Sequence, residues 1–299
     1  MKLRGIYADA STGKKLLIVL LVFAIMFLVT VMALTVITIL TGSGQEDRTI
    51  MLTGVVLQNL LLFILSPLIC VFFISAPGED MLKTRRFPSL SEFLLCLLTM
   101  IVMTPAMNLL VMWNQSMHLP EALSGLEEWM RQQEDMAEET TRILLDAKSI
   151  GALLLLIFIV GFLTGVGEEF TFRGIIQNLI AGKRRNAHAA VWITAIIFSA
   201  VHLQFYGFIP RLAIGAYLGY LLVWSRSIWL PVFAHFVNNS LAVISSYIVA
   251  NEYCSDKIDT IGTSQDGTLW MAAASAVAFA ACATQLYHIS KEAQTPPQP

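Results

Sequence analysis

Eight long runs of apolar residues dominate this sequence of 299 residues and constrain its fold. They cover residues 16–42, 52–76, 89–113, 149–181, 187–205, 207–225, 228–250 and 268–289. A helix needs about 20 predominantly apolar residues to cross the hydrocarbon core of a bilayer. Only 13% of the residues are charged, whereas soluble domains carry about 25% charged residues. The sequence therefore predicts an all-α, polytopic membrane helical bundle of about eight transmembrane helices.

The basic residues between these runs predict the orientation of the bundle. With the N-terminus in the cytoplasm, the segments on that side carry 12 lysines and arginines, against 5 on the other side. The twelve are Lys2, Arg4, Lys14, Lys15, Lys83, Arg85, Arg86, Lys183, Arg184, Arg185, Arg226 and Lys291, and the five are Arg48, Arg131, Arg142, Lys148 and Lys257. Cytoplasmic segments carry the excess of lysine and arginine in membrane proteins. We expect a multi-pass protein of the cell membrane with both termini cytoplasmic.

One connection between the runs is long enough to form a helix of its own. Residues 120–147 are acidic and place apolar groups such as Leu126 and Trp129 at a helical period. We expect an amphipathic extramembrane helix at about 120–147, outside, against the bundle or the lipid interface. The chain then divides into three parts. These are three transmembrane helices with this loop helix (1–148), a helical core (149–250), and a final transmembrane helix with a flexible tail (251–299).

Two adjacent carboxylates and an arginine interrupt the fourth apolar run, in the segment GVGEEFTFR at residues 165–173. A carboxylate in the centre of a bilayer raises the free energy of insertion by roughly 2.5–3.5 kcal/mol, so such residues usually serve a function. Glu169 and Arg173 are four residues apart and can pair on one helix face, whereas Glu168 is rotated by about 100° from Glu169. The structural alternative is a buried ion-pair cluster that only fixes packing.

The following runs supply further polar groups. His202 ends FSAVH at residues 198–202, and HFVNN at 235–239 presents His235 and Asn239 on one helix face, with Asn238 expected to point elsewhere. At a rise of about 1.5 Å per residue, these groups and Glu168 lie within about two helical turns of one level. We expect them to converge in one cavity that is accessible from the cytoplasmic side.

A glutamate, two histidines and an asparagine suit the hydrolysis of an acyl bond. A carboxylate and an imidazole can take a proton from water, while a second imidazole and an amide stabilise the oxyanion. Alternatively, His202 and His235 ligate a metal ion, with zinc the expected one, that lowers the pKa of bound water. Arg173 would keep Glu169 ionised and leave Glu168 as the general base. The sequence contains neither H-E-x-x-H nor G-x-S-x-G, motifs of two other hydrolase designs.

These motifs resemble those of one known family. EEFTFR fits E-E-x-x-x-R, FSAVH fits F-x-x-x-H and HFVNN fits H-x-x-x-N, in this order over about 150–245. The pattern resembles the CPBP group of CAAX-processing type 2 prenyl endopeptidases, bacteriocin-processing proteins and abortive-infection proteins. The resemblance implies an intramembrane glutamate protease or metalloprotease. The residues implied to activate water are Glu168 and His202, those for the oxyanion or a metal are His235 and Asn239, and the supporting pair is Glu169 and Arg173.

We therefore expect an intramembrane endopeptidase that hydrolyses a peptide bond of a membrane-embedded or lipidated substrate. Its expected partners are that substrate and the lipid bilayer, and the sequence shows no nucleic-acid-binding signature. Two functions of other classes stay open. A non-proteolytic membrane immunity or scaffold protein would tolerate Glu168→Ala. A proton-coupled transporter would use the intramembrane Glu and His residues to relay protons, and such proteins usually contain an internal repeat, which this sequence does not show.

Overall fold

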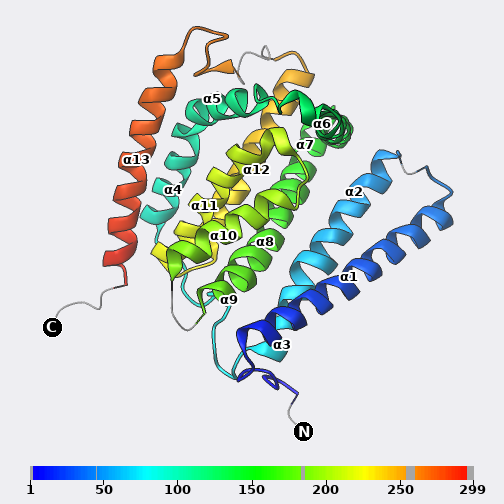
Figure 1. The fold of residues 1–299 in the computed structure, drawn as a ribbon, viewed down its shortest axis with the longest axis vertical. Helices are drawn as coiled ribbons and strands as arrows, with labels where there is room; N and C mark the ends of the chain where they lie inside the picture. Colours follow the sequence, from blue (N-terminus) through cyan, green and yellow to red (C-terminus); the bar gives the residue numbers. More distant parts are fainter. Residues whose placement is uncertain (1–2, 45, 183–185, 254–259, 295–299) are drawn as a thin grey trace.

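The chain folds into a bundle of helices, seen in a computed structural model (Figure 1). The structure describes residues 3–44, 46–182, 186–253 and 260–294, and none of these residues lies in a β-strand. Several residues used in the sequence predictions lie outside this described part: Lys2, Lys183, Arg184, Arg185, Lys257 and the tail 295–299. The predicted division of the chain into three parts stays a prediction.

Six helical segments of the described chain are long and apolar enough to cross a membrane. They are Thr12–Thr41 (α1), Arg48–Ile74, Ile150–Ala181, Phe205–Ser225, Trp229–Ala250 (α12) and Leu269–Glu292 (α13). Leu90–Val102 (α4) and Thr104–Gln115 (α5), bent by 44°, would together make a seventh. The predicted span at 187–205 contains a helix of only 14 residues, Ala187–Ala200 (α10). The predicted all-α membrane bundle is confirmed, with six or seven spans by length and the shorter α10 in place of the eighth.

Two of the spans contain π-helical stretches. Arg48–Ile74 consists of α2 (Arg48–Leu57), η1 (Gln58–Leu65, π-helical) and α3 (Ser66–Ile74). Ile150–Ala181 consists of α7 (Ile150–Leu156), η3 (Ile157–Leu163, π-helical), α8 (Thr164–Glu169), η4 (Phe170–Gln177, π-helical) and α9 (Asn178–Ala181). The side chain that follows each π-helical stretch donates a 3.2 Å hydrogen bond to the carbonyl five residues earlier; these donors are Ser66, Thr164 and Asn178. These side chains donate hydrogen bonds to backbone carbonyls inside an apolar bundle, where no water is available to do so.

Glycines let the central helices approach closely. A Cβ atom added at Gly165 would lie 3.3 Å from the amide nitrogen of Phe236, and one at Gly161 would lie 2.7 Å from the hydroxyl of Ser240. The long span therefore packs onto α12 through these two glycines. Gly215 and Gly219 of α11 (Phe208–Ser225) lie in the same way against α10. Gly161/Gly165 and Gly215/Gly219, each two small residues four positions apart, thus sit at close helix crossings, as is common in membrane bundles.

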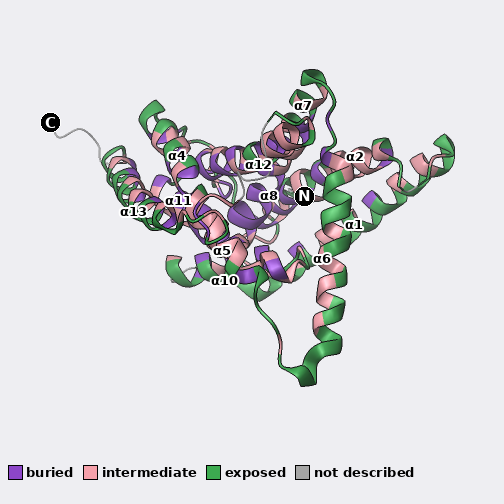
Figure 2. Ribbon diagram, turned by 90° about the horizontal axis from the view of Figure 1, so that it is seen from above, coloured by how far each residue is buried: buried purple, intermediate pink, exposed green. Residues whose placement is uncertain are grey.

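A single helix crosses one end of the bundle. It is α6 (Ser124–Leu145), which follows a short 3₁₀ turn at Glu121–Leu123 (η2) and lies within the predicted range of 120–147. The start of α1 and the end of α13 lie toward the opposite end (Figure 1). Figure 2 shows α6 extending away from the bundle, while buried residues gather around α8, α11 and α12. Apolar side chains of α6, such as Trp129 and Met136, stay largely exposed.

The close crossing at Gly165 generates a prediction. Gly165→Val would place a branched side chain against the backbone of α12, which cannot move aside as a flexible side chain can. Overpacking of this kind destabilises a protein by about 1–3 kcal/mol. We expect a lower thermal unfolding midpoint in detergent for Gly165→Val. Gly151→Val is the matched control, because a Cβ atom at Gly151 has its first neighbour, the Ser149 hydroxyl, at 3.9 Å. Equal midpoints for the two variants would contradict the tight α8–α12 crossing.

Candidate active site

The two adjacent glutamates occupy the last turn of α8, in the buried centre of the bundle. The Glu169 carboxylate and the Arg173 guanidinium are completely buried and form an ion pair of 2.8 Å, as their spacing predicts. Arg173 also donates a 2.9 Å hydrogen bond to the carbonyl oxygen of Gly215 on α11. Because Gly215 lies at a close helix crossing, its carbonyl is within reach of an arginine on the neighbouring span. The pair therefore links η4, α8 and α11.

His235 lies between the two glutamates. Its Nδ1 is 2.7 Å from Oε1 of Glu169, and its Nε2 is 3.7 Å from Oε2 of Glu168. An ionised carboxylate can only accept, so the Nδ1–H of His235 donates to Glu169. The second distance is too long for a direct hydrogen bond. One imidazole thus joins the supporting carboxylate to the predicted general base, a contact between α12 and α8 that the sequence did not predict.

His202 reaches the site because α10 is short. The chain reverses directly after this helix, and Leu203 adopts a φ of 55° there, in the left-handed region that is costly for a non-glycine residue. The Nδ1–H of His202 donates a 2.7 Å hydrogen bond to the carbonyl oxygen of Phe198. This tautomer leaves Nε2 of the half-buried ring as a proton acceptor. The short helix thereby places a histidine inside the bundle, where a full span would carry it to the surface.

The Phe198 ring contacts the charged and aromatic groups of the site. Its centroid is 5.2 Å from that of His202 and 5.9 Å from that of His235. The Arg173 guanidinium lies 4.6 Å from the same centroid, on the ring face. Phe198 thus brings both predicted histidines and the supporting arginine to one place. The sequence pattern included Phe198 in its second motif but assigned it no role.

Asn239 faces the same span as the glutamates. Its amide nitrogen donates a 3.0 Å hydrogen bond to the carbonyl oxygen of Val160 in η3, and its amide oxygen accepts one of 3.1 Å from Asn238. Asn238 reaches the site residues only through this bond to its neighbour, and the expectation that it points elsewhere stays a prediction. One N–H of Asn239 is left for another acceptor. All six predicted site residues lie on α8, η4, α12 or the turn after α10.

The donor geometry does not suit a zinc ion. Catalytic zinc sites use three protein ligands, and no three His, Cys, Asp or Glu side chains of the described residues are close enough to hold one ion. The Nδ1 atoms of His202 and His235 are engaged with Phe198 and Glu169, as is common for histidine ligands, so that only the Nε2 atoms could bind an ion. The predicted pair of histidine ligands thus has no third ligand placed beside it.

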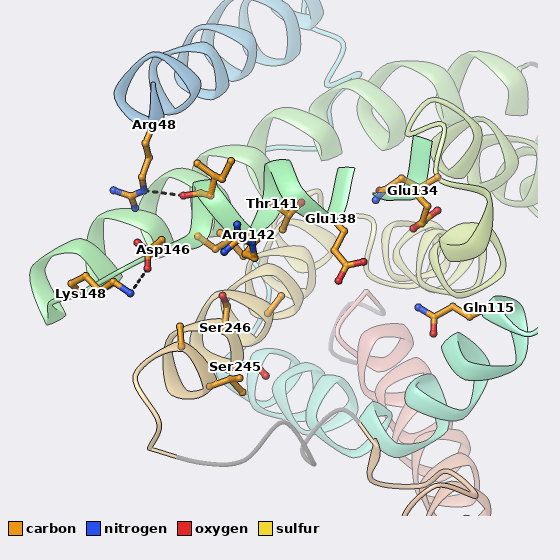
Figure 3. A pocket seen from close by; sticks show the side chains of 16 residues that line it. Arg48, Gln115, Glu134, Glu138, Thr141, Arg142, Asp146, Lys148, Ser245 and Ser246 are labelled. Carbon is orange, nitrogen blue, oxygen red and sulfur yellow. Dashed lines mark hydrogen bonds and ion pairs between the residues drawn. The ribbon is translucent and has the colours of Figure 1, made fainter. Parts of the chain in front are cut away.

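A cavity of about 1000 Å³ lies between α6 and the end of α12 (Figure 3). Ala242 and Ser246 of α12 line it, about 4.5 Å and 10 Å along the helix axis beyond Asn239 at about 1.5 Å per residue. Gln204, two residues after His202, lines it as well. This cavity lies at the α6 end of the bundle. The sequence predicted access from the opposite end, where the first and last helices begin and finish.

One charged residue near the cavity was not among the predicted site residues. Arg211 lies within a predicted span, near the start of α11, and donates to both the side chain and the carbonyl of Gln204. An ionisable residue in an apolar run is itself a signal of function, and this signal would have identified Arg211.

Comparisons with known proteins match the part of the chain that carries the site. Residues 150–241 match the family described as "Type II CAAX prenyl endopeptidase Rce1-like". The "Putative membrane peptidase YdiL" of Bacillus subtilis (strain 168) is 32% identical over 106 residues, which cover 36% of this chain and 42% of the relative. The "Uncharacterized protein YpbD" of the same organism is 29% identical over 94 residues, 30% of this chain and 43% of the relative.

The chain thus spans about two fifths of the length of these curated relatives. No solved structure matches it. The matched segment contains Glu168, Glu169, Arg173, His202, His235 and Asn239 and begins with α7. Residues 150–241 are therefore similar to the Rce1-like family, and the three motifs that they contain resemble those of the CPBP group.

Proposed function

We propose that this multi-pass membrane protein is an intramembrane endopeptidase that hydrolyses a peptide bond with water activated by Glu168 and His202. The observation that carries the proposal is the arrangement of Glu168, Glu169 and His235 in the buried centre of apolar helices. Arg173 pairs with Glu169, whereas no lysine or arginine of the described chain lies within 4.0 Å of Glu168, whose only neighbour of this kind is the His235 ring at 3.7 Å. Glu168 is thus the carboxylate that is free to take a proton.

The proposed reaction uses only the chain's own groups. The Glu168 carboxylate takes a proton from water, which Nε2 of His202 orients as a hydrogen-bond acceptor, and the hydroxide attacks the carbonyl carbon of the peptide. The free N–H of Asn239 stabilises the oxyanion, and His235 does so when its Nε2 carries a proton in addition to the Nδ1–H that Glu169 accepts. When the C–N bond breaks, the proton on Glu168 passes to the leaving amine. Glu169 and Arg173 act by holding His235 in place.

The substrate class follows from the position of the site. The glutamates lie within the span Ile150–Ala181, so a peptide bond can reach them only from a segment that enters or lies close to the bilayer. A membrane-embedded or lipidated peptide meets this requirement. The name of the Rce1-like family points to the same class, because prenyl endopeptidases act on lipidated chains.

We further propose that both termini face the cytoplasm. The N-terminal segment bonds to the end of α3 through Gly5 and Phe72, and the loop after α3 bonds to the start of α12 through Lys83 and Ile228. These segments, with most of the basic residues that the structure describes, lie at the end opposite to α6. The excess of positive charge at this end favours the cytoplasm.

Removal of the general base is the first test of the function. In cells that express matched levels of protein, we expect new peptide termini in membranes with the wild type and their loss with Glu168→Gln. Loss of a general base lowers the rate by about 100-fold or more. Glu128→Gln, the same change on the exposed surface of α6, is the control and should keep the termini. If neither variant changes any terminus while the cellular phenotype persists, a non-proteolytic scaffold replaces the peptidase.

The buried ion pair generates a second prediction. Arg173→Met leaves the Glu169 charge buried without its guanidinium, and breaking such a pair costs about 3–5 kcal/mol. The double variant Glu169→Gln/Arg173→Met removes both charges, so we expect it to lose less stability than the sum of the single variants. Thermal unfolding of the three purified proteins in detergent measures this coupling. Strict additivity would show that the two side chains do not depend on each other.

Metal removal provides a third test. Because the described donors do not gather around one ion, we expect cleavage to persist after treatment with 1,10-phenanthroline and dialysis. The readout is the cleavage rate of a substrate taken from the comparison of termini, with and without added Zn²⁺. A loss of cleavage that Zn²⁺ restores would overturn the metal-free mechanism and assign His202 and His235 as ligands.

A further inference from the structure

Arg211 is a cation without a carboxylate partner near the start of α11. Its Nη2–H donates a 2.7 Å hydrogen bond to the side-chain oxygen of Gln204, and its Nη1–H donates one of 3.4 Å to the carbonyl of the same residue. No carboxylate of the described residues lies within 4.0 Å of this guanidinium. Charged side chains within spans are expensive and generally pair or act on a substrate. The guanidinium is therefore available to pair with an anionic group from outside the described chain.

Other arginines at this end of the bundle are already engaged. Arg131 and Arg142 pair with glutamates of α6 at 2.6 Å and 2.7 Å. Arg48 donates to the carbonyl oxygens of Ile143 and Leu144, where α6 ends. Arg211 differs, because a neutral glutamine holds it in place. It is therefore preorganised and still able to receive a carboxylate.

The guanidinium is bonded to a residue of the cavity wall and is within electrostatic reach of Glu168 and His202. Gln204, which holds it, lines the cavity that Figure 3 shows. The carboxylates whose charges reach Arg211 are Glu134, which also lines the cavity, and Glu168. The charge of Arg211 in turn reaches His202. A group bound to Arg211 would thus be close both to the cavity and to the site of hydrolysis.

We propose that Arg211 binds a carboxylate of the peptide substrate and so positions the scissile bond beside Glu168 and His202. A guanidinium presents a planar fork of N–H donors that matches a carboxylate and forms strong, directional hydrogen bonds with it. The carboxylate can be the C-terminus of the substrate or an aspartate or glutamate side chain. The proposal rests on the proposed peptidase function and adds the chemical feature by which the substrate is selected.

Glu134 is the cavity carboxylate that would repel such a substrate. It accepts a 3.2 Å hydrogen bond from the amide of Tyr206, in the 3₁₀ turn Phe205–Gly207 (η5) that precedes α11. Burial raises the pKa of the Glu134 carboxyl, as do the nearby charges of Glu138 and Asp135, while the Tyr206 amide and Arg211 act in the opposite direction. A raised pKa favours the neutral form. Any repulsion of a substrate carboxylate by Glu134 therefore falls as the pH is lowered toward the raised pKa of this carboxyl.

The test measures binding, so that it does not depend on turnover. Dansyl-labelled decapeptides of Ala, Leu, Phe and Ser are titrated into detergent-solubilised Glu168→Gln protein in three forms. One has a free C-terminal carboxylate, one a C-terminal amide, and one a C-terminal amide with a single internal glutamate. We expect at least one acidic form to bind about tenfold more tightly than the plain amide. The form that does so identifies the source of the carboxylate.

Three further substitutions in the same background decide the role of Arg211. Arg211→Gln should abolish the preference for the acidic form. Gln204→Glu should also abolish the preference, because the new carboxylate would occupy the guanidinium. This variant keeps the test valid if the Arg211→Gln protein fails to fold. Arg142→Gln removes an arginine that lines the same cavity but is paired with Glu139, and it should keep the preference.

Equal binding of the three peptide forms, whether all bind or none does, would overturn the proposal. So would a preference that survives both Arg211→Gln and Gln204→Glu. Failure of the peptidase function looks different. In that case, wild-type protein would cleave no peptide while the Arg211-dependent preference for a carboxylate remained.

Discussion

One carboxylate oxygen, Oε1 of Glu169, accepts hydrogen bonds from both Arg173 and His235 inside helices that can span a membrane. A lone guanidinium or carboxylate would lose several kcal/mol of hydration there, so each charge depends on the other. The shared oxygen also ties three spans together, because Arg173 continues to α11 and His235 belongs to α12. Glu168, one residue earlier, stays outside this pairing and keeps its carboxylate available for chemistry.

This arrangement requires backbones that approach closely. Arg173 reaches the carbonyl oxygen of Gly215, and Gln177, four residues later, reaches that of Gly219. Larger residues at these glycines would meet α10 or the Gln177 side chain. The polar side chains of η4 therefore depend on small residues of α11 for their acceptors. The absence of a side chain at these glycines lets the helices approach closely. The hydrogen bonds from Arg173 and Gln177 then replace those that water would make outside the bilayer.

The proposed catalytic residues and the cavity lie at different depths of the bundle. The glutamates lie near the middle of the span Ile150–Ala181 and His235 lies in the first two turns of α12, whereas the cavity lies between α6 and the last turns of α12. The short α10 connects the two levels, because the chain turns back at His202 and immediately places Gln204 in the cavity wall. The α6 helix is attached to this turn through the Trp129 and Phe205 rings, whose centroids are 5.5 Å apart. Movements of α6 would thus reach the segment that carries His202.

Sequence spacing was sufficient for the features that depend on one helix. The transfer of about 20 apolar residues into lipid is a property of the segment itself, so the membrane bundle could be predicted from the runs alone. The pairing of Glu169 with Arg173 follows from four-residue spacing, and the close crossings follow from glycine pairs. The catalytic roles of the six site residues stay predictions, supported by motifs that match the Rce1-like family.

Contacts between helices could not be predicted in this way. The sequence by itself determined an all-helical membrane protein with its polar groups at one depth. Only the tertiary structure decided that His235 lies between the two glutamates, that Phe198 contacts both histidines, and that Arg211 lies beside the cavity. The physical reason is that such contacts depend on how each helix is rotated about its axis. Here that rotation is set together by π-helical turns, the early end of α10 and glycine packing. The residue pattern of a single helix therefore does not predict it.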